Sequence, residues 1–347
     1  MSVTVKPFGT MPDGREVSNY ILDNGWMQVE LIDFGATIKN IWVPDKNGKK
    51  ADVVLGKDCL EDFLANRAAT AATIGRHANR VEGAVYEFEG KLHHMEANAA
   101  GNNLHSGKYN YGIQLFDART VGDNAVAFTY LDKGGDDFFP GDVLATVTYT
   151  LTDDNQLILH YLGLATHRTP INMTNHAYFN LAGHESGPIY DQILQMDCDF
   201  FTHANDTCSA TGEISRVEGT PFDFREPTPI GKNIRSEHHM IKGNNGYDVN
   251  FVLNGRDYRK VGYARDEASG RTMEIYTDLP GCQLYTTNAI DPTIRFKDDV
   301  KYVPHQGFCL ETQYFTNFMK YAHLSPQAFF DKNHPYETQT SYKFIVE

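Results

Sequence analysis

Short runs of residues that favour β-strands, each followed by a turn signal, recur along almost the whole chain. Residues 20–22 lead into the turn Asp23-Asn24-Gly25 and then into residues 26–32, which predicts a β-hairpin. A second hairpin is predicted between residues 146–151 and 156–161. The chain also contains 29 glycines and 14 prolines, spread through closely spaced turns. This pattern predicts an all-β sandwich.

Helical signals are few and short. Residues 58–64 could form two helical turns with Asp58 as the N-cap, and residues 230–240 are a weaker candidate. No internal repeat, low-complexity tract or linker-like change in composition is visible. A length of 347 residues would suit two domains, but the uniform strand pattern predicts a single domain over residues 1–347.

The charge balance limits the partners that this chain could bind. It carries 45 acidic and 31 basic residues, a net charge of −14, which argues against a nucleic-acid partner and against an anionic membrane surface. The N-terminus has no apolar core followed by a cleavage site, and no run of about 18 apolar residues occurs. The sequence therefore predicts a cytoplasmic protein without a membrane partner.

The five cysteines are scattered and form no CxxC pair, which argues against a disulfide framework or a zinc ribbon. Cys198 and Cys208 could approach each other, but reduced thiols are expected in a cytosolic chain. Cys282 and Cys309 lie in apolar strand-like runs. We expect these two to be small core residues, because no base stands beside them in an obvious motif.

Residues 170–181 interleave apolar and polar side chains in a way that a plain core strand would not. If this segment is extended, His176, Tyr178 and Asn180 share one face, because side chains alternate along a strand. A face with an imidazole, a phenol and an amide suits a polyhydroxylated ligand. We therefore expect the rest of the chain to hold His176 opposite a carboxylate.

Two carboxylates are candidates for that position or for ligand binding. Glu311 ends the apolar run 307–310, where a charge is costly unless it has a partner or a task. It could pair with a basic side chain, or it could act in catalysis. Asp248 lies in a loop rich in glycine and asparagine, where it could form an Asx turn or accept hydrogen bonds from sugar hydroxyls.

Basic residues and a histidine cluster earlier in the chain. Arg76, Asn79 and Arg80 stand within six residues, but no glycine-rich cradle surrounds them as a phosphate site would require. His105 lies in a turn, where a histidine on its own is often a surface or structural residue.

Metal-dependent and serine-dependent chemistry find little support. The adjacent pairs His93-His94 and His238-His239 would point to opposite faces of a strand, and no HExxH motif occurs. No GxSxG motif occurs either, which argues against a serine hydrolase of that type. The sequence therefore predicts no metal site.

Taken together, these segments resemble the aldose 1-epimerase (galactose mutarotase) family, in order and at fitting separations. The run Asn-Met-Thr-Asn-His-Ala-Tyr-Phe-Asn-Leu at 172–181 is the most specific part. The likeness covers nearly the whole chain, through residues 74–80, 103–107, 140–141, 172–181, 212, 220–225, 246–251, 280–285 and 307–313.

The resemblance implies one large antiparallel β-sandwich with a free sugar in a cleft, and catalysis without cofactor or metal. By position, His176 resembles the general acid and Glu311 the general base, and His105 could stabilise the transition state near the ring oxygen. The family's substrate-binding positions correspond to Asn79, Arg80, His105, Tyr178, Asp248 and Gln283. Either a monomer or a homodimer is compatible with the sequence.

These residue types fit the chemistry of anomer interconversion. The C1 hydroxyl loses a proton while the ring oxygen gains one, the ring opens to an aldehyde, and closure follows rotation about C1–C2. Ionised Glu311 and protonated His176 are the expected starting pair, and each then reverses its role. Such reversal works best when both proton affinities lie near the operating pH.

Departures from the family pattern fall near the expected rim of the cleft. Val249 follows Asp248 where many members have histidine, and Ser106 replaces the first of two glycines after His105. Residues 314–323 also depart from the usual run rich in proline and asparagine. These changes bear on substrate preference, with galactose or glucose as the first candidates.

Three other functions remain open from the sequence. A hexose-6-phosphate 1-epimerase of the same fold would need a basic cluster at the mouth of the cleft. A catalytically silent carbohydrate-binding protein would bind sugar without turnover. A glycosidase would need two carboxylates about 5 to 9.5 Å apart, for which Asp248 and Glu311 are the candidates.

Overall fold

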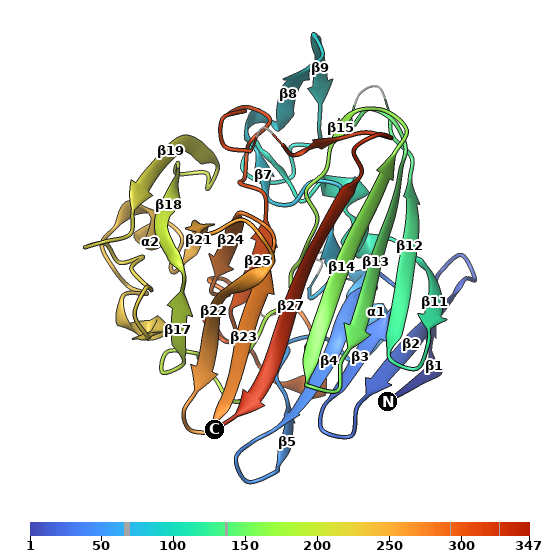
Figure 1. Ribbon diagram of the computed structural model, residues 1–347, viewed down its shortest axis with the longest axis vertical. Helices are drawn as coiled ribbons and strands as arrows, with labels where there is room; N and C mark the ends of the chain where they lie inside the picture. Colours follow the sequence, from blue (N-terminus) through green and yellow to red (C-terminus); the bar gives the residue numbers. More distant parts are fainter. Residues whose placement is uncertain (66–69, 136–137, 292, 326) are drawn as a thin grey trace.

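The computed structural model describes residues 1–65, 70–135, 138–291, 293–325 and 327–347, and it is built mainly from antiparallel strands (Figure 1). The all-β prediction is confirmed. Both predicted hairpins are present: β2 (Glu16–Asp23) pairs with β3 (Gln28–Ile32), and β13 (Val143–Leu151) pairs with β14 (Gln156–Ala165).

A nine-stranded sheet forms one layer of the molecule. Buried and more exposed residues alternate along β13 and β14, as expected for a sheet with one face on the core. The C-terminal strand lies in the middle of this sheet, between β14 and β23 (Figure 1). The remaining strands are, in spatial order, β11 (Asp117–Val121), β12 (Ala125–Asp132), β27 (Tyr336–Val346), β23 (Arg271–Thr277), β22 (Arg259–Asp266), β17 (Ile193–Met196) and β20 (Thr228–Pro229).

Two five-stranded sheets cover the inner face of this layer. The first runs in sequence order and adds to β2 and β3 the strands β1 (Ser2–Thr10), β4 (Thr37–Pro44) and β5 (Lys50–Asp52). The second has the order β19 (Ala210–Arg216), β18 (Cys198–Ala204), β21 (Asp248–Leu253), β24 (Gly281–Tyr285) and β25 (Cys309–Gln313).

Side-chain contacts join both smaller sheets to the large one. Tyr20 of β2 meets Phe128 of β12 with ring centroids 5.5 Å apart. Tyr342 of β27 donates a hydrogen bond from Oη to the backbone carbonyl of Leu310 in β25, at 3.2 Å. One hydrophobic cluster contains residues of all three sheets. The expected sandwich architecture is therefore present, and β25 is buried along its full length.

Short strand pairs and helices complete the fold. The predicted helix at 58–64 appears as α1 (Leu60–Ala65), and the weaker candidate at 230–240 divides into the 3-10 turn η4 (Ile230–Lys232) and α2 (His239–Lys242). None of the helices in the described residues is long and apolar enough to span a membrane. The strand pairs are β6 (Thr73–Ile74) with β16 (Thr174–Asn175), β7 (Arg80–Val81) with β10 (Asn103–Leu104), β8 (Val85–Phe88) with β9 (Lys91–His94), and β15 (Thr169–Pro170) with β26 (Phe329–Phe330). The other 3-10 turns are η1 (Glu82–Ala84), η2 (Gly107–Tyr109), η3 (Tyr111–Ile113) and η5 (Lys297–Asp299).

All five cysteines are free thiols, as the sequence predicted. Cys198, Cys282 and Cys309 are buried. Cys208 is partly exposed and donates a hydrogen bond from Sγ to Oδ1 of Asn244, at 2.8 Å, so it is not paired with Cys198.

Candidate active site

A cavity of about 450 Å³ opens beside strands β21, β24 and β25. The structure brings seven of the eight predicted site residues to its wall, from segments far apart in the sequence: Asn79, Arg80, His105, His176, Tyr178, Asp248 and Glu311. The eighth, Gln283, does not line the cavity but contacts a residue that does.

His176 follows directly after β16 and is held by its backbone. Its N–H donates to the carbonyl of Ala72 at 3.0 Å, and its carbonyl accepts from the N–H of Ala71 at 2.9 Å. The imidazole stacks on Tyr178, with ring centroids 4.9 Å apart, and meets the ring of His105 edge-on at 5.3 Å. These contacts fix the plane of the ring at the cavity wall.

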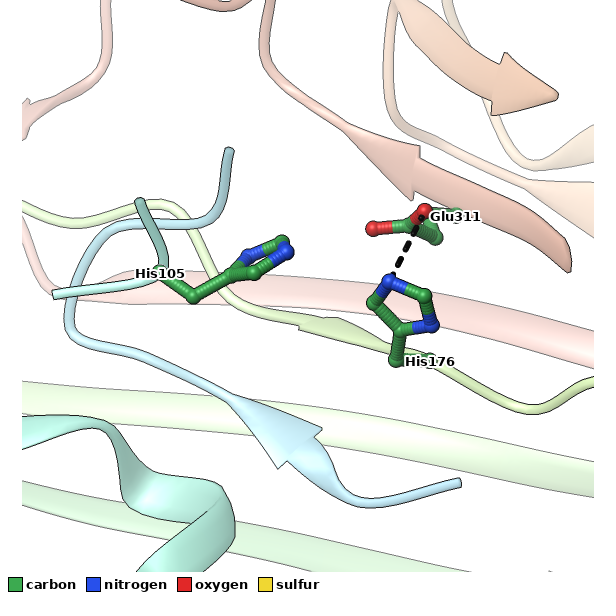
Figure 2. A group of neighbouring side chains, drawn as sticks. All are labelled: His105, His176 and Glu311. Atoms are coloured by element: carbon green, nitrogen blue, oxygen red, sulfur yellow. Dashed lines mark ion pairs between the residues drawn. The ribbon is translucent and has the colours of Figure 1, made fainter. Parts of the chain in front are cut away.

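Glu311 lies in the middle of β25, where its partner in the strand register is Gln283 of β24. Its Oε1 lies 3.5 Å from Nε2 of His176, and the two side chains face one another in Figure 2. The carboxylate is only 2 % exposed, and its Oε2 has no hydrogen-bond partner among the described residues. A buried acceptor without a partner is costly unless a ligand completes it.

Burial shifts the pKa values of His176 and Glu311 in opposite directions. It lowers the pKa of His176 to about 4, because the charged imidazolium is poorly solvated there. Burial, with a further contribution from the charge of Asp248, raises the pKa of Glu311 well above its ordinary value, and Arg80 offsets part of this rise.

These shifts favour placing the shared proton on Glu311. The sequence led us to expect the other arrangement, with Glu311 ionised and His176 protonated. The two arrangements hold the same number of protons, so they are two forms of one coupled pair.

His105 is a neutral hydrogen-bond donor toward this pair. Burial lowers its pKa well below the ordinary value, with the neighbouring charges of His176 and Arg80 acting in the same direction. Its Nδ1 accepts a hydrogen bond from the backbone N–H of Asn79 at 3.1 Å. The proton of the neutral ring must therefore sit on Nε2, the nitrogen directed toward His176 and Glu311 in Figure 2.

The same hydrogen bond bears on metal binding. Ligand atoms of His105, His176 and Glu311 lie within 4.8 Å of one another, a grouping that could hold a metal ion. A metal on Nε2 of His105 would require its proton to move to Nδ1, and the bond from Asn79 would be lost. The local hydrogen bonding therefore favours a donor at this position over a metal ligand.

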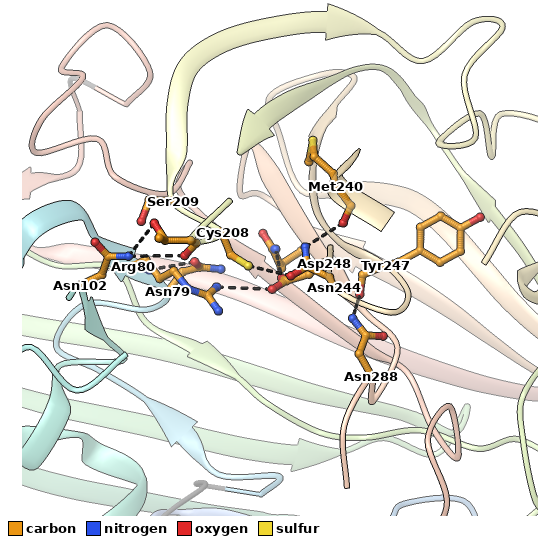
Figure 3. Close-up of polar contacts among 12 residues, drawn as sticks. Asn79, Arg80, Asn102, Cys208, Ser209, Met240, Asn244, Tyr247, Asp248 and Asn288 are labelled. Atoms are coloured by element: carbon orange, nitrogen blue, oxygen red, sulfur yellow. Dashed lines mark hydrogen bonds and ion pairs between the residues drawn. The ribbon is translucent and has the colours of Figure 1, made fainter. Parts of the chain in front are cut away.

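Asp248, the first residue of β21, also lines the cavity and is held by two contacts. Its Oδ1 accepts a hydrogen bond from Nε2 of Gln283 at 2.6 Å, and Nη1 of Arg80 lies 3.4 Å from its Oδ2. Figure 3 shows Arg80 and Asp248 facing one another, with Cys208 and Asn244 beside them. Gln283 thus acts on the cavity by orienting Asp248.

One sequence-based expectation about a polar residue is wrong. Asn180 does not share the cavity face with His176 and Tyr178, because the chain after β16 is not a regular strand. Its amide instead donates to the carbonyls of Gly187 at 2.9 Å and Gln306 at 2.7 Å.

Arg76 is equally unavailable to a ligand. Its side chain is buried and donates from Nε to Oδ2 of Asp132 at 2.7 Å. Arg76 therefore cannot form a phosphate-binding site together with Arg80. Arg80 does line the cavity, beside Asp248.

The cavity also contains residues that the sequence did not single out. Tyr285 meets the rings of His176 and Tyr178 edge-on, both at 6.2 Å. It stands two positions after Gln283 on β24, so strand alternation could have found it. The others come from turns, loops and the two-residue strand β10 and give no such signal: Glu96, Asn98, Leu104, Gly107, Lys108, Asn110 and Ile113.

The fold and this cavity together define a β-sandwich protein with a buried imidazole–carboxylate pair in a polar, ligand-sized site. Comparison with known proteins makes the assignment more specific. The sequence model of the aldose 1-epimerase family matches residues 18–343, and the chain therefore belongs to that family.

The matches to individual relatives extend over nearly the full length of both proteins. The chain is 36% identical to a galactose mutarotase of Bos taurus, covering 100% of this chain and 99% of that protein. It is 30% identical to an aldose 1-epimerase of Escherichia coli, with 97% of each covered. A solved aldose epimerase homologue from C. elegans superposes with a TM-score of 0.85 at 27% identity, covering 99% of both chains.

Proposed function

We propose that this protein is an aldose 1-epimerase that interconverts the α- and β-anomers of free hexoses such as D-galactose and D-glucose. His176 and Glu311 form its acid/base pair, and the reaction needs no cofactor. The observation that carries the proposal is the 3.5 Å contact between Nε2 of His176 and Oε1 of Glu311 at the wall of a polar cavity.

The pair can move the two protons that the reaction requires. In the ion-pair form, Glu311 accepts the proton of the C1 hydroxyl while Nε2 of His176 gives a proton to the ring oxygen. The C1–O5 bond breaks, and the open-chain aldehyde faces protonated Glu311 and neutral His176. After rotation about C1–C2, both transfers run backwards and close the ring with the opposite configuration.

The opposite pKa shifts suit this exchange. In water a histidine holds its proton more tightly than a glutamate, so the pair would favour one form strongly. Burial lowers the pKa of His176 and raises that of Glu311, which makes the neutral form accessible. The neutral form is the one that accompanies the open-chain sugar.

The remaining polar residues supply binding and orientation. Nε2–H of His105 points toward the pair and can donate to an oxygen on which negative charge develops. Asp248 and Arg80 offer an acceptor and donors to other hydroxyls of the sugar, and Tyr178 provides an aromatic face. Asn79 supports this set through the hydrogen bond from its backbone N–H to His105.

The cavity favours a free sugar over a sugar phosphate. Its described lining contains two basic residues, Arg80 and Lys108, and three acidic ones, Glu96, Asp248 and Glu311. Arg80 is already paired with Asp248, and Nζ of Lys108 lies over the ring of Tyr109. The His176–Glu311 pair shares one proton and adds no net charge, so a phosphate dianion would meet a site without net positive charge.

Polarimetry on freshly dissolved α-D-galactose tests the function. We expect the wild type to accelerate mutarotation and Glu311→Gln to lower kcat by about 100- to 10,000-fold. Glu337→Gln is a matched control, because Glu337 pairs with His160 at the surface, far more exposed. No acceleration by the wild type, or an unchanged rate in Glu311→Gln, contradicts the proposal.

Substrate choice is tested in the same assay. Initial rates with galactose, glucose, xylose and arabinose rank the sugars, and galactose 6-phosphate serves as a competitor. We expect the phosphate ester to compete more weakly than free galactose. Sugar binding without any acceleration would instead favour a catalytically silent carbohydrate-binding protein.

A further inference from the structure

The two nitrogens of the His176 ring face two side chains of one strand. Cys309 and Glu311 stand two positions apart on β25, so strand alternation presents both to the same face. Nδ1 of His176 lies 3.4 Å from Sγ of Cys309, and Nε2 lies 3.5 Å from Oε1 of Glu311. The imidazole therefore lies along one face of β25, with Nδ1 at the Cys309 thiol and Nε2 at the Glu311 carboxylate.

The other contacts of the ring do not select which edge faces Glu311. Stacking on Tyr178 and the edge contact with His105 hold the ring plane, but a half-turn about the bond to the ring leaves both contacts nearly unchanged. That half-turn would place carbon atoms where Nδ1 and Nε2 now lie. The contact with Glu311 favours a nitrogen at that edge, and a polar partner at Nδ1 adds to it in fixing the orientation with Nε2 toward Glu311.

We propose that Cys309 is a positioning residue for the acid/base pair, and that its thiol holds the His176 ring with Nε2 toward Glu311. The inference rests on the proposed function of the pair. It assigns a role in the reaction to a side chain that the sequence pattern alone indicated to be a small core residue.

A thiol can hold the tautomer that the reaction requires. The reaction uses the proton of Nε2, so Nδ1 keeps its proton in both protonation states of the ring, and Sγ can accept that proton in a weak hydrogen bond. Burial raises the pKa of the Cys309 thiol well above its ordinary value, so the S–H group persists throughout the working pH range.

Cys282 provides a matched control within the same sheet. It lies on the adjacent strand β24, and like Cys309 it is fully buried with a raised pKa. Its Sγ lies 4.0 Å from the carbonyl of Gln283, and within the described part of the chain no hydrogen bond joins it to His176. Truncating Cys282 removes the same atoms from the core without touching the ring.

The experiment compares Cys309→Ala, Cys309→Ser and Cys282→Ala. We expect Cys309→Ala to lower kcat by about tenfold, the effect of roughly 1.4 kcal/mol on the barrier, with KM changed by less than about twofold. Cys309→Ser, which also donates and accepts, should recover kcat to within about threefold of wild type, and Cys282→Ala should match wild type. If Cys309→Ala does not fold, Cys309→Val keeps more of the volume and serves in its place.

Nitrogen-15 NMR of the His176 ring gives a readout that does not depend on turnover. We expect the Nδ1 and Nε2 shifts to change in Cys309→Ala and to return toward wild type in Cys309→Ser. Wild-type shifts and kcat in Cys309→Ala overturn the inference, and so does an equal loss of kcat in Cys282→Ala. A wild type that fails to accelerate mutarotation contradicts the proposed function, while the ring shifts still decide whether Cys309 holds His176.

Discussion

Nε2 of His176 lies 3.5 Å from Oε1 of Glu311, and both side chains are almost completely shielded from solvent. Burial lowers the pKa of the imidazole to about 4 and raises the pKa of the carboxyl well above its ordinary value. The order of proton affinity that the two groups have in water is thereby reversed in this site. A sugar that brings hydroxyl and ring oxygens to the pair can restore the ion-pair form by hydrogen bonding to it.

The pH dependence of kcat/KM should be bell-shaped, because the active pair carries one proton. As the pH falls to about 4, the pair gains a second proton, so that His176 and Glu311 are both protonated. Glu311 can then no longer act as a base. As the pH rises through the raised pKa of Glu311, the pair loses its proton and the ring oxygen has no acid. Polarimetry across the pH range checks both limbs.

The pH at which the acid limb of the kcat/KM profile falls tests whether burial lowers the pKa of His176. We expect the limb near pH 4 in the wild type and in the surface control Glu337→Gln. An acid limb at about 6.5, the ordinary value of a solvated histidine, contradicts the assigned shift.

Replacing Glu311 by glutamine should stabilise the fold at high pH. The pKa of Glu311 is higher in the folded chain than in the unfolded one, so its proton-linked stabilisation is complete below the unfolded pKa and is lost as the pH rises through the folded pKa. Glutamine does not titrate, so the variant loses no stability over that pH range. At alkaline pH we expect the free energy of unfolding of Glu311→Gln to be higher than that of the wild type by about 1–3 kcal/mol. This is the usual cost of an unsatisfied buried polar group.

Urea unfolding at an acidic and an alkaline pH measures this difference. The advantage of Glu311→Gln should shrink toward the acidic pH, where the wild-type carboxyl is protonated. Glu337→Gln, at an exposed position, should show little difference at either pH. A wild type that is the more stable protein at alkaline pH would show that the folded-state pKa is not raised.

The fold was predictable where neighbouring residues carry the signal. Alternation and the turn at Asp23-Asn24-Gly25 predicted the β2–β3 hairpin, which is present. The middle position of β27 in the large sheet was not predictable in this way, because its partners β14 and β23 lie far away in the sequence. Local periodicity reports which face of a strand is buried, not which strand lies beside it.

The same distinction separates the site residues. Tyr178 lies beside His176 in the sequence and in space, whereas Glu311 was assigned as its counterpart only through family resemblance. Asn180 was misplaced because alternation was extended beyond the end of β16. Gln283 was expected to bind the ligand, which stays a prediction, and the register of β21 and β24 places its amide against Asp248, a contact that the sequence did not indicate.

Removing metal ions should leave the activity unchanged. The Asn79 N–H holds Nδ1 of His105 as an acceptor, so Nε2 keeps its proton and is a poor metal ligand. We expect a protein treated with EDTA and dialysed to keep the kcat of the untreated protein in the polarimetric assay. A loss of activity that zinc restores would contradict the donor role of His105.

His105 itself should contribute to kcat as a donor. We expect His105→Phe, which keeps an aromatic ring but has no N–H, to lower kcat by about 100- to 1,000-fold, as found for other donors to a developing oxyanion. His203→Phe is a control, because His203 bonds to Ser215 through Nε2 and does not line the cavity. An unchanged kcat in His105→Phe would leave His105 with a structural role alone.

Gln283 should act on substrate affinity through Asp248. Its Nε2 donates to Oδ1 of Asp248 at 2.6 Å, while Arg80 reaches Oδ2 at only 3.4 Å, so the amide is the closer of the two contacts that orient the carboxylate. In Gln283→Leu we expect KM for galactose to rise about tenfold, consistent with the loss of one hydrogen bond to a charged group, and kcat to change by less than about threefold. Gln192→Leu removes an equally buried amide that bonds to Asn180 away from the cavity, and it should leave KM unchanged. A fall in kcat with constant KM in Gln283→Leu would place the amide's effect on Glu311, its partner in the strand register, rather than on Asp248.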